Sequence, residues 1–294
     1  VSKMVISCAK VLEEKGVTPN TPVGVYCTQK VDTIVLMFAL CAIGGIYVPI
    51  DRAIPKKRAD YILDASQAKM IISPVEIPYE TKTEQIILKV EDLDLSKGID
   101  KPYKNRDRIA YVMFTSGTTG TPKGVEIKER YLQNMCLWYD REFGMGPDTR
   151  SILINNYSFD GSLKTIFAPL TYGGCLVLGP EIAFDITAMM KIIRDVKVTH
   201  LAGVPSLIKE VISESSNSNY SNLGSIKWTI SAGERFRSGE ILDWQKSGVC
   251  QSKFVNLYGP VECSCAVSWH VLDYDELKES EIPLGEPIYN KRIY

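Results

Sequence analysis

The chain contains Tyr111-Val-Met-Phe-Thr-Ser-Gly-Thr-Thr-Gly-Thr-Pro-Lys-Gly124, in which four apolar or aromatic residues lead into a loop of glycines and hydroxyl side chains. The apolar residues predict a short strand. In the loop, glycines let backbone N–H groups approach a polyanion, hydroxyls add hydrogen-bond donors, and a lysine supplies a positive charge. The pattern therefore predicts a site for a triphosphate. Its predicted phosphate-binding residues are Thr115, Ser116, Gly117, Thr118, Thr119, Gly120 and Lys123.

This loop differs from the P-loop of kinases and ATPases. A P-loop has glycine directly before its lysine and serine or threonine directly after it, whereas Lys123 lies between Pro122 and Gly124. A surface turn rich in glycine and threonine is the simpler interpretation of such a loop taken alone. The rest of the chain has to decide between a turn and a phosphate site.

On both sides of the loop, apolar segments of strand length alternate with segments of helix length. This alternation predicts an α/β fold with mostly parallel strands. The predicted helices are residues 3–14, 31–43, 58–65, 129–142, 161–169, 186–196 and 205–214. The predicted strands are residues 23–27, 46–50, 70–73, 111–114, 151–155, 175–178, 198–202, 228–231 and 253–257. Residues 74–106 are polar and predict one strand and a surface connection.

Composition and charge exclude several classes of protein. The 294 residues are 45% hydrophobic and 23% charged, a globular balance, and the net charge of −1 provides no basic field for nucleic acid or an anionic membrane. The uncharged residues 34–50 are too short for a membrane span and include Gly44, Gly45 and Pro49. We expect a buried helix there, then a glycine turn and a strand. No nucleic-acid or membrane partner is predicted.

Cysteine and histidine usage predicts a reduced protein without zinc. The eight cysteines are scattered and form no C-x-x-C pair, and the chain has only two histidines. Buried thiols of this kind are typical of a cytoplasmic protein. The first 17 residues carry Lys10, Glu13, Glu14 and Lys15 where a signal peptide needs an apolar run. His200 lies on a predicted strand and is expected in the core.

Five further segments follow in a fixed order: CAIGGIYVPID (41–51), NNYSFD (155–160), ISAGE (230–234), NLYGPVE (256–262) and IPLGEPIYNKRIY (282–294). Together with the phosphate loop, they resemble the motifs of the adenylate-forming superfamily, which includes nonribosomal peptide synthetase adenylation domains, acyl-CoA synthetases and luciferases. The resemblance covers essentially the whole chain. Asp160 and the Val-Pro-Ile-Asp string favour the branch that activates amino acids.

The resemblance implies the large N-terminal core of such a domain, a layered αβαβα arrangement with mostly parallel sheets. We expect a first α/β portion at about residues 1–106, a portion with the phosphate loop and the substrate and adenine sites at about 107–270, and the start of a β region at about 271–294. By the same resemblance the chain begins inside the family's first motif. The ribose-binding aspartate, the hinge and the catalytic lysine of the C-terminal lid lie beyond Tyr294, so no catalytic residue is assigned.

The resemblance also implies roles for individual residues. Adenine contacts would come from Gly233, Asn256, Tyr258 and Gly259. Glu262 would bind Mg²⁺, and Asp160 would pair with the α-ammonium group of an amino acid. The remaining substrate-binding residues would be Gly161, Lys164, Ala202, Ile230, Ala232, Leu257, Cys265 and Ala266.

Each polar role has a simpler alternative. Tyr258 could pack in the core, and Glu262 could be a solvated glutamate at a helix start. Asp160 could be a helix N-cap, a role compatible with binding an ammonium group. Lys164 lies one helical turn after Asp160 and could face the pocket, where it would meet an acidic or amide side chain. Its alternatives are a plain ion pair with Asp160 or a side chain that reaches solvent.

The implied function is ATP- and Mg²⁺-dependent activation of an amino acid as an aminoacyl-adenylate. The partners would be the amino acid, a carrier protein with a phosphopantetheine arm and neighbouring synthetase domains. Two alternatives stay open: an acyl- or aryl-CoA synthetase of the same fold, and a degenerate, non-catalytic scaffold. Val261 replaces the family's usual threonine, which contacts the α-phosphate. With the lid also absent, we expect these 294 residues to bind their ligands weakly and to adenylate poorly.

Overall fold

The computed structural model describes residues 1–28, 30–115, 122–180, 185–235, 241–273 and 282–294. Contacts divide the chain into two compact units. The first unit is Val1–Leu132 with Asn156–Ser158, and the second is Gln133–Asn155 with Phe159–Tyr294. The three portions expected from the sequence concern the family's subdomains and stay a prediction.

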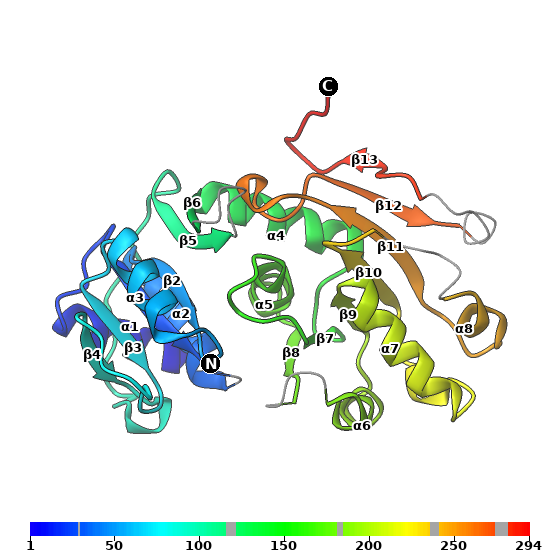
Figure 1. Cartoon of the computed structure of the whole chain (residues 1–294), viewed down its shortest axis with the longest axis horizontal. Coiled ribbons are helices and arrows are strands. Elements are labelled where there is room, and N and C mark those ends of the chain that lie inside the picture. The colour runs from blue at the N-terminus through cyan, green and yellow to red at the C-terminus, as the bar shows by residue number, and fades with distance from the viewer. Residues whose placement is uncertain (29, 116–121, 181–184, 236–240, 274–281) are drawn as a thin grey trace. The chain divides into compact units, whose positions relative to one another are not determined.

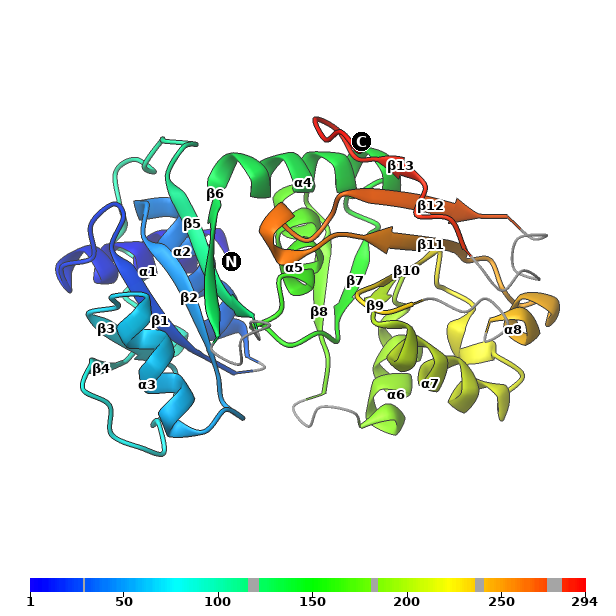
Figure 2. The same cartoon turned by 45° about the horizontal axis from the view of Figure 1, so that its top comes forward.

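The first unit is built on a mostly parallel sheet. Its strands run in the order β4-β3-β1-β2-β5-β6, and only β6 is antiparallel to its neighbour among the strands described. In Figure 2, α3 lies on one face of this sheet, and α1 and α2 lie on the other. The elements are α1 (Ser2–Glu14), β1 (Pro22–Cys27), α2 (Val31–Ile43), β2 (Ile46–Asp51), α3 (Lys56–Ala65), β3 (Met70–Ser73), β4 (Glu84–Ile87), the 3₁₀-helix η1 (Val90–Asp92), β5 (Ile109–Thr115) and β6 (Lys123–Lys128).

The uncharged segment folds as expected. Helix α2 ends where Gly44 adopts φ +80°, and β2 starts two residues later. In the described part of the chain, no helix combines the length and the apolar character needed to cross a bilayer.

The second unit has a longer sheet. Its strands run in the order β13-β12-β11-β10-β9-β7-β8; β7 to β11 are parallel, whereas β12 and β13 are antiparallel additions. Helix α5 packs on β7 and β8, and α7 packs on β9 and β10. Figure 1 shows α5 and α7 on opposite sides of the sheet. The mostly parallel α/β fold predicted from the sequence is thereby confirmed for both units.

The remaining bounds complete this unit. Helix α4 (Glu129–Phe143) starts in the first unit and continues into the second. The other elements are β7 (Arg150–Leu153), α5 (Gly161–Thr171), β8 (Cys175–Leu178), α6 (Ile186–Val196), β9 (His200–Gly203), α7 (Pro205–Ser216), η2 (Ser221–Leu223), β10 (Trp228–Ala232), α8 (Leu242–Lys246), β11 (Lys253–Tyr258), η4 (Val261–Cys263), β12 (Ser268–Leu272) and β13 (Glu286–Pro287).

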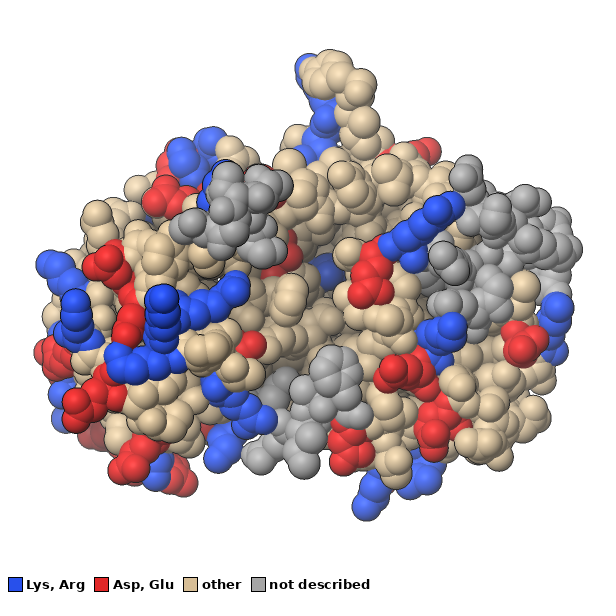
Figure 3. Space-filling model, in the orientation of Figure 1, with Lys and Arg blue, Asp and Glu red and all other residues tan. Residues whose placement is uncertain are grey.

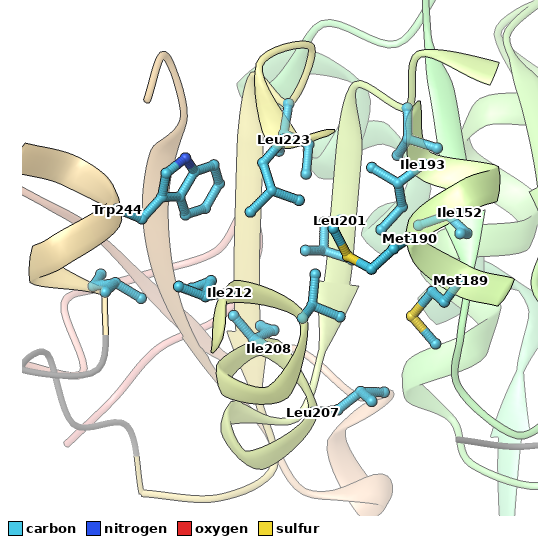
Figure 4. Close-up of a cluster of buried hydrophobic side chains, with 14 of the residues drawn as sticks. Ile152, Met189, Met190, Ile193, Leu201, Leu207, Ile208, Ile212, Leu223 and Trp244 are labelled. Carbon is cyan, nitrogen blue, oxygen red and sulfur yellow. The ribbon is translucent and has the colours of Figure 1, made fainter. Parts of the chain in front are cut away.

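A buried apolar cluster holds α6, α7 and α8 against the second sheet. Figure 4 shows Met190 of α6 beside Leu201 of the sheet, with Ile193 of α6 and Ile208 of α7 in the same cluster. Trp244 of α8 is fully buried and meets Phe254 edge to face, with ring centroids 5.3 Å apart. Dense apolar packing of this kind fixes the strands whose ends form the site.

Element boundaries differ from the sequence prediction by a few residues. The predicted strand 151–155 ends at Leu153, and the predicted strand 198–202 is displaced to His200–Gly203. Helix α5 continues past Pro169 to Thr171. Pro169 has no N–H to donate to Thr165 O, so α5 lacks one hydrogen bond in its last turn and ends two residues later.

The charges are mixed over the surface, as the net charge of −1 predicts. On the face shown in Figure 3, both units carry interspersed basic and acidic side chains. The eight cysteines all lie in described parts of the chain and are present as thiols.

His200 lies in the core, as expected. It is 3% exposed, its Nε2 lies 3.1 Å from Phe143 O, and its Nδ1 lies 2.8 Å from Thr199 Oγ1. Burial lowers the pKa of His200 to about 4, whereas an unfolded histidine titrates near about 6.5. Between these values the unfolded chain binds the proton and the folded chain does not.

We therefore expect the free energy of unfolding to fall as the pH drops from about 6.5 toward 4, with His200 contributing up to about 3 kcal/mol of the loss. Urea denaturation across this range would measure it. His200→Gln should remove this part of the pH dependence, and His270→Gln, at the other histidine, should retain it. An unchanged pH profile in His200→Gln would contradict the assignment.

Candidate functional site

A pocket of about 640 Å³ opens at the carboxyl ends of β10 and β11 in the second unit. In open α/β sheets, ligands bind at this edge because the loops that leave the strands can surround them. The pocket is lined by Gly233, Glu234, Arg235, Asn256, Leu257, Tyr258, Gly259, Pro260, Ile282 and Leu284. The four residues predicted to contact adenine are all among them.

Two glycines shape the backbone of this pocket. Gly233 follows β10 directly and has φ +93°, a conformation that a side chain disfavours. A Cβ at Gly259 would lie 2.6 Å from the backbone nitrogen of Ala266. The chain after β11 therefore packs backbone to backbone against the Cys265–Ala266 turn, which only glycine allows.

Asn256 and Tyr258 lie two residues apart on β11, so their side chains share one face of the sheet. Asn256 is 8% exposed, and its Nδ2 donates a hydrogen bond to Pro283 O over 2.9 Å. Tyr258 is 48% exposed, so its ring is not a core residue. An open aromatic face beside an ordered amide suits the stacking and edge contacts of a planar base.

Asp160 occupies the N-cap position of α5 without acting as a cap. Its side chain accepts no capping hydrogen bond, so the N-cap alternative is wrong. Within the described residues, its Oδ2 is buried and has no hydrogen-bond partner. Burial raises the pKa of Asp160, and the charge of Lys164 opposes that rise. A buried carboxylate oxygen without a donor is costly unless a ligand supplies one.

Lys164 is 2% exposed, so the interpretation that it reaches solvent is wrong. Its Nζ donates a hydrogen bond to Gly161 O over 2.9 Å. In the described part of the chain it forms no ion pair with Asp160 or with any other carboxylate, so the plain ion-pair alternative is wrong too. Its positive charge still acts on Asp160, whose pKa it lowers against the effect of burial.

The other residues predicted to bind substrate are apolar and mostly buried. Ala202 on β9, Ile230 on β10, Leu257 on β11, Cys265 and Ala266 are buried, and Ala232 is half-buried. Burial raises the pKa of Cys265 to about 12, while Lys164 lowers it and Asp160 raises it. These charges therefore act on the turn that packs against Gly259. Their roles toward a substrate stay predictions.

The phosphate loop belongs to the first unit. Thr115 ends β5, Lys123 starts β6, and the two are paired in the antiparallel ladder. Lys123 is exposed. The other predicted phosphate-binding residues, Ser116, Gly117, Thr118, Thr119 and Gly120, lie outside the described residues.

The sequence did not identify Tyr61 as part of this loop's support. Its OH donates a hydrogen bond to Pro122 O over 2.9 Å, and its ring packs edge to face on Phe114 with centroids 6.2 Å apart. The contact joins residues 61 positions apart, so no local pattern signals it. Arg235 and Leu284 of the pocket were also missed, although they adjoin or lie within quoted motifs.

Glu262 is exposed in the 3₁₀-helix η4. No group of three or more His, Cys, Asp or Glu side chains in the described ranges could hold a metal ion by itself. Mg²⁺ fits such a position, because it is often bound by one or two carboxylates, with water and substrate phosphates as the other ligands. Glu262 is the acidic residue of the pocket motif suited to this.

The family model described as AMP-binding enzyme matches residues 1–294. Gramicidin S synthase 2 of Aneurinibacillus migulanus is 33% identical over 295 residues, covering 97% of this chain and 6% of the relative. Tyrocidine synthase 3 of Brevibacillus parabrevis is 32% identical over 291 residues, covering 97% of this chain and 4% of the relative. The chain thus spans a small fraction of these curated relatives.

Solved structures share the fold. The nonribosomal peptide synthetase FmoA3 in its AMPPNP-bound form superposes with a TM-score of 0.86 at 25% identity, covering 98% of this chain and 31% of that chain. The N-terminal subdomain of Klebsiella oxytoca NpsA, in complex with anthranilyl-AMSN, gives a TM-score of 0.85 at 22% identity. That match covers 98% of this chain and 73% of the NpsA chain.

Proposed function

Because the chain belongs to the AMP-binding enzyme family, we propose that it activates an amino acid with ATP for nonribosomal peptide synthesis. The observation that carries the proposal is the buried Oδ2 of Asp160, which has no hydrogen-bond partner in the described structure. An amino acid differs from other carboxylic acids by its α-ammonium group, and that group supplies the missing donor. A simple acyl substrate would leave the Asp160 charge unpaired, which disfavours the CoA-synthetase alternative.

In the proposed reaction, a carboxylate oxygen of the amino acid attacks the α-phosphorus of ATP. The bond from that phosphorus to the bridging oxygen breaks, and pyrophosphate leaves with the electron pair. Two anions must meet in line, so the site has to neutralise charge and hold both reactants in register. Asp160 would orient the amino acid through its ammonium group, and Tyr258 and Asn256 would hold the adenine ring.

Phosphate binding is assigned to Thr115, Lys123 and the loop between them. The hydroxyl and ammonium groups would bind the β- and γ-phosphates. Glu262 would hold Mg²⁺, which, when bound, offsets the phosphates' negative charge. Val261 supplies no hydroxyl where the family has threonine; loss of one oriented donor can lower a rate roughly 10²–10³-fold unless a neighbour compensates.

The aminoacyl-adenylate would then pass to a carrier protein. The thiolate of its phosphopantetheine arm attacks the acyl carbon, a thioester forms, and AMP leaves. This chain covers only 6% of gramicidin S synthase 2 and 4% of tyrocidine synthase 3, which supports carrier and neighbouring synthetase domains as partners. The thiol state of the cysteines supports a cytoplasmic location.

ATP–pyrophosphate exchange tests the proposal directly. A chain that also includes the C-terminal lid expected of the family should exchange label with one or a few amino acids in a broad panel. These 294 residues alone should exchange far more slowly. The absence of exchange with every amino acid in the longer chain would favour a non-catalytic scaffold instead.

Tyr258→Ala should weaken AMP binding by about 5- to 100-fold, because stacking on a base is worth about 1–3 kcal/mol. Titration calorimetry with this chain measures the affinity. Tyr294→Ala is the matched control, since Tyr294 is fully exposed and does not line the pocket. Equal affinities for the wild type and Tyr258→Ala would place adenine elsewhere.

A further inference from the structure

Two opposite charges at the start of α5 are buried without forming an ion pair within the described structure. Asp160 has a buried oxygen that accepts no hydrogen bond, and Lys164 is 2% exposed and donates only to a backbone carbonyl among the described residues. The two side chains do not form an ion pair with each other within the described structure, although each could in principle satisfy the other. Both charges are therefore available to a third group.

The ammonium group of Lys164 is held back over the first turn of α5. Its hydrogen bond to Gly161 O is 2.9 Å long, and a Cβ at Gly161 would lie 3.3 Å from Nζ. Long side chains on a helix lean toward its N-terminus, which brings this group toward Asp160. Glycine at position 161 leaves the space beside Nζ open.

Asp160 is the anion on which the charge of Lys164 acts, and the proposed function commits Asp160 to the α-ammonium group of the substrate. Cys265, on which the charge of Lys164 also acts, carries no thiolate at neutral pH, because burial raises its pKa to about 12. A buried ammonium group is unfavourable unless it meets an anion or several acceptors. The ammonium group of Lys164 has three N–H donors, and its bond to the Gly161 carbonyl occupies one of them, which leaves two donors for a ligand.

Charge balance then selects the class of substrate. Asp160 pairs with the α-ammonium group, and the α-carboxylate is consumed in the reaction with ATP. A neutral side chain would leave Lys164 without a counter-ion, and a basic side chain would add repulsion. With a side-chain carboxylate on the substrate, Lys164 gains a counter-ion while Asp160 pairs with the α-ammonium group.

We propose that the amino acid activated at this site has an acidic side chain, of the aspartate or glutamate type, whose carboxylate binds the Lys164 ammonium group. The inference rests on the proposed function, because it assumes that Asp160 and Lys164 face the bound amino acid. The pocket supports this placement through Gly259, which packs on the backbone of Ala266 beside Cys265. The charges of Lys164 and Asp160 both shift the pKa of Cys265, so Cys265 lies near both groups.

Aminoacyl sulfamoyl-adenosines, which mimic an aminoacyl-adenylate without needing the lid, test the inference on this chain. Titration calorimetry would compare the glutamyl with the glutaminyl analogue and the aspartyl with the asparaginyl analogue. These pairs match in shape and differ in charge. At least one acidic analogue should bind about 10- to 100-fold more tightly than its amide, the range expected of a buried charge-assisted hydrogen bond.

Lys164→Met keeps the length of the side chain and removes the charge, and Lys191→Met, at an exposed lysine of α6, is its control. Lys164→Met should lose the preference for the acidic analogue, and Lys191→Met should keep it. The wild-type comparison stands by itself if Lys164→Met does not fold.

Three results would overturn the inference. If neutral analogues bound as tightly as acidic ones, the acidic substrate would be excluded, and the proposed function would stay intact. If Lys164→Met lowered the affinity for every analogue equally, Lys164 would bind the sulfamoyl linker, which replaces the phosphate, and not the side chain. Failure of all the analogues to bind would overturn the proposed function as well.

Discussion

Replacing Asp160 with alanine should weaken binding of alanyl sulfamoyl-adenosine by at least about 100-fold. The α-ammonium group would lose its carboxylate while remaining buried, and breaking a buried charge pair from one side costs about 3–5 kcal/mol. The propionyl analogue, which lacks the α-amino group, should bind the variant at least as well as the wild type. Titration calorimetry on this chain measures both affinities.

The same variant separates a binding role from a structural one. Asp160 makes no capping hydrogen bond, so Asp160→Ala should not lower the free energy of unfolding, whereas loss of a true N-cap costs about 1 kcal/mol. Asp195→Ala removes an exposed aspartate of α6 and serves as the control. Equal losses for the alanyl and propionyl analogues would show that Asp160 does not recognise the ammonium group.

Gly259→Ala should destabilise the second unit and abolish nucleotide binding. The added Cβ would lie 2.6–2.7 Å from three backbone atoms of Cys265 and Ala266. Backbone cannot move aside as a flexible side chain can, so a loss of about 2–4 kcal/mol in the free energy of unfolding is expected. Urea denaturation and AMP titration measure the two effects.

Gly146→Ala is the matched control for this substitution. A Cβ at Gly146 meets nothing within 4 Å, and its φ is not positive. It should change stability by less than about 0.5 kcal/mol. If Gly259→Ala bound AMP with unchanged affinity, the pocket at the ends of β10 and β11 would not be the nucleotide site.

Most of the fold could be predicted from local patterns. Helix Val31–Ile43 and strand Met70–Ser73 were predicted to the residue, because apolar periodicity and glycine turns mark such elements within a short window. The boundaries of β7 and β9 were less predictable. They depend on where neighbouring strands stop pairing, which is a property of the sheet.

For the site, only residues that lie close together in the sequence could be predicted to share a pocket. Asn256, Tyr258 and Gly259 share one motif, so their common pocket followed from their spacing. Tyr61 and Leu284 did not, because each contributes through a contact formed by folding between distant segments. The sequence also left the alternatives for Asp160 and Lys164 open, because spacing along a helix shows which side chains can meet but not which of them do.

The sequence by itself determined the order of the elements, the mostly parallel sheets and the ordered motifs of an adenylate-forming family, since these are local and periodic features. Only the tertiary structure decided that Lys164 is buried without an ion pair and that Asp160 caps nothing. Burial and charge balance depend on every group packed around a side chain. Glu262 and Cys265, for example, act on Asp160 or are acted on by it, and they lie about a hundred residues along the chain from α5.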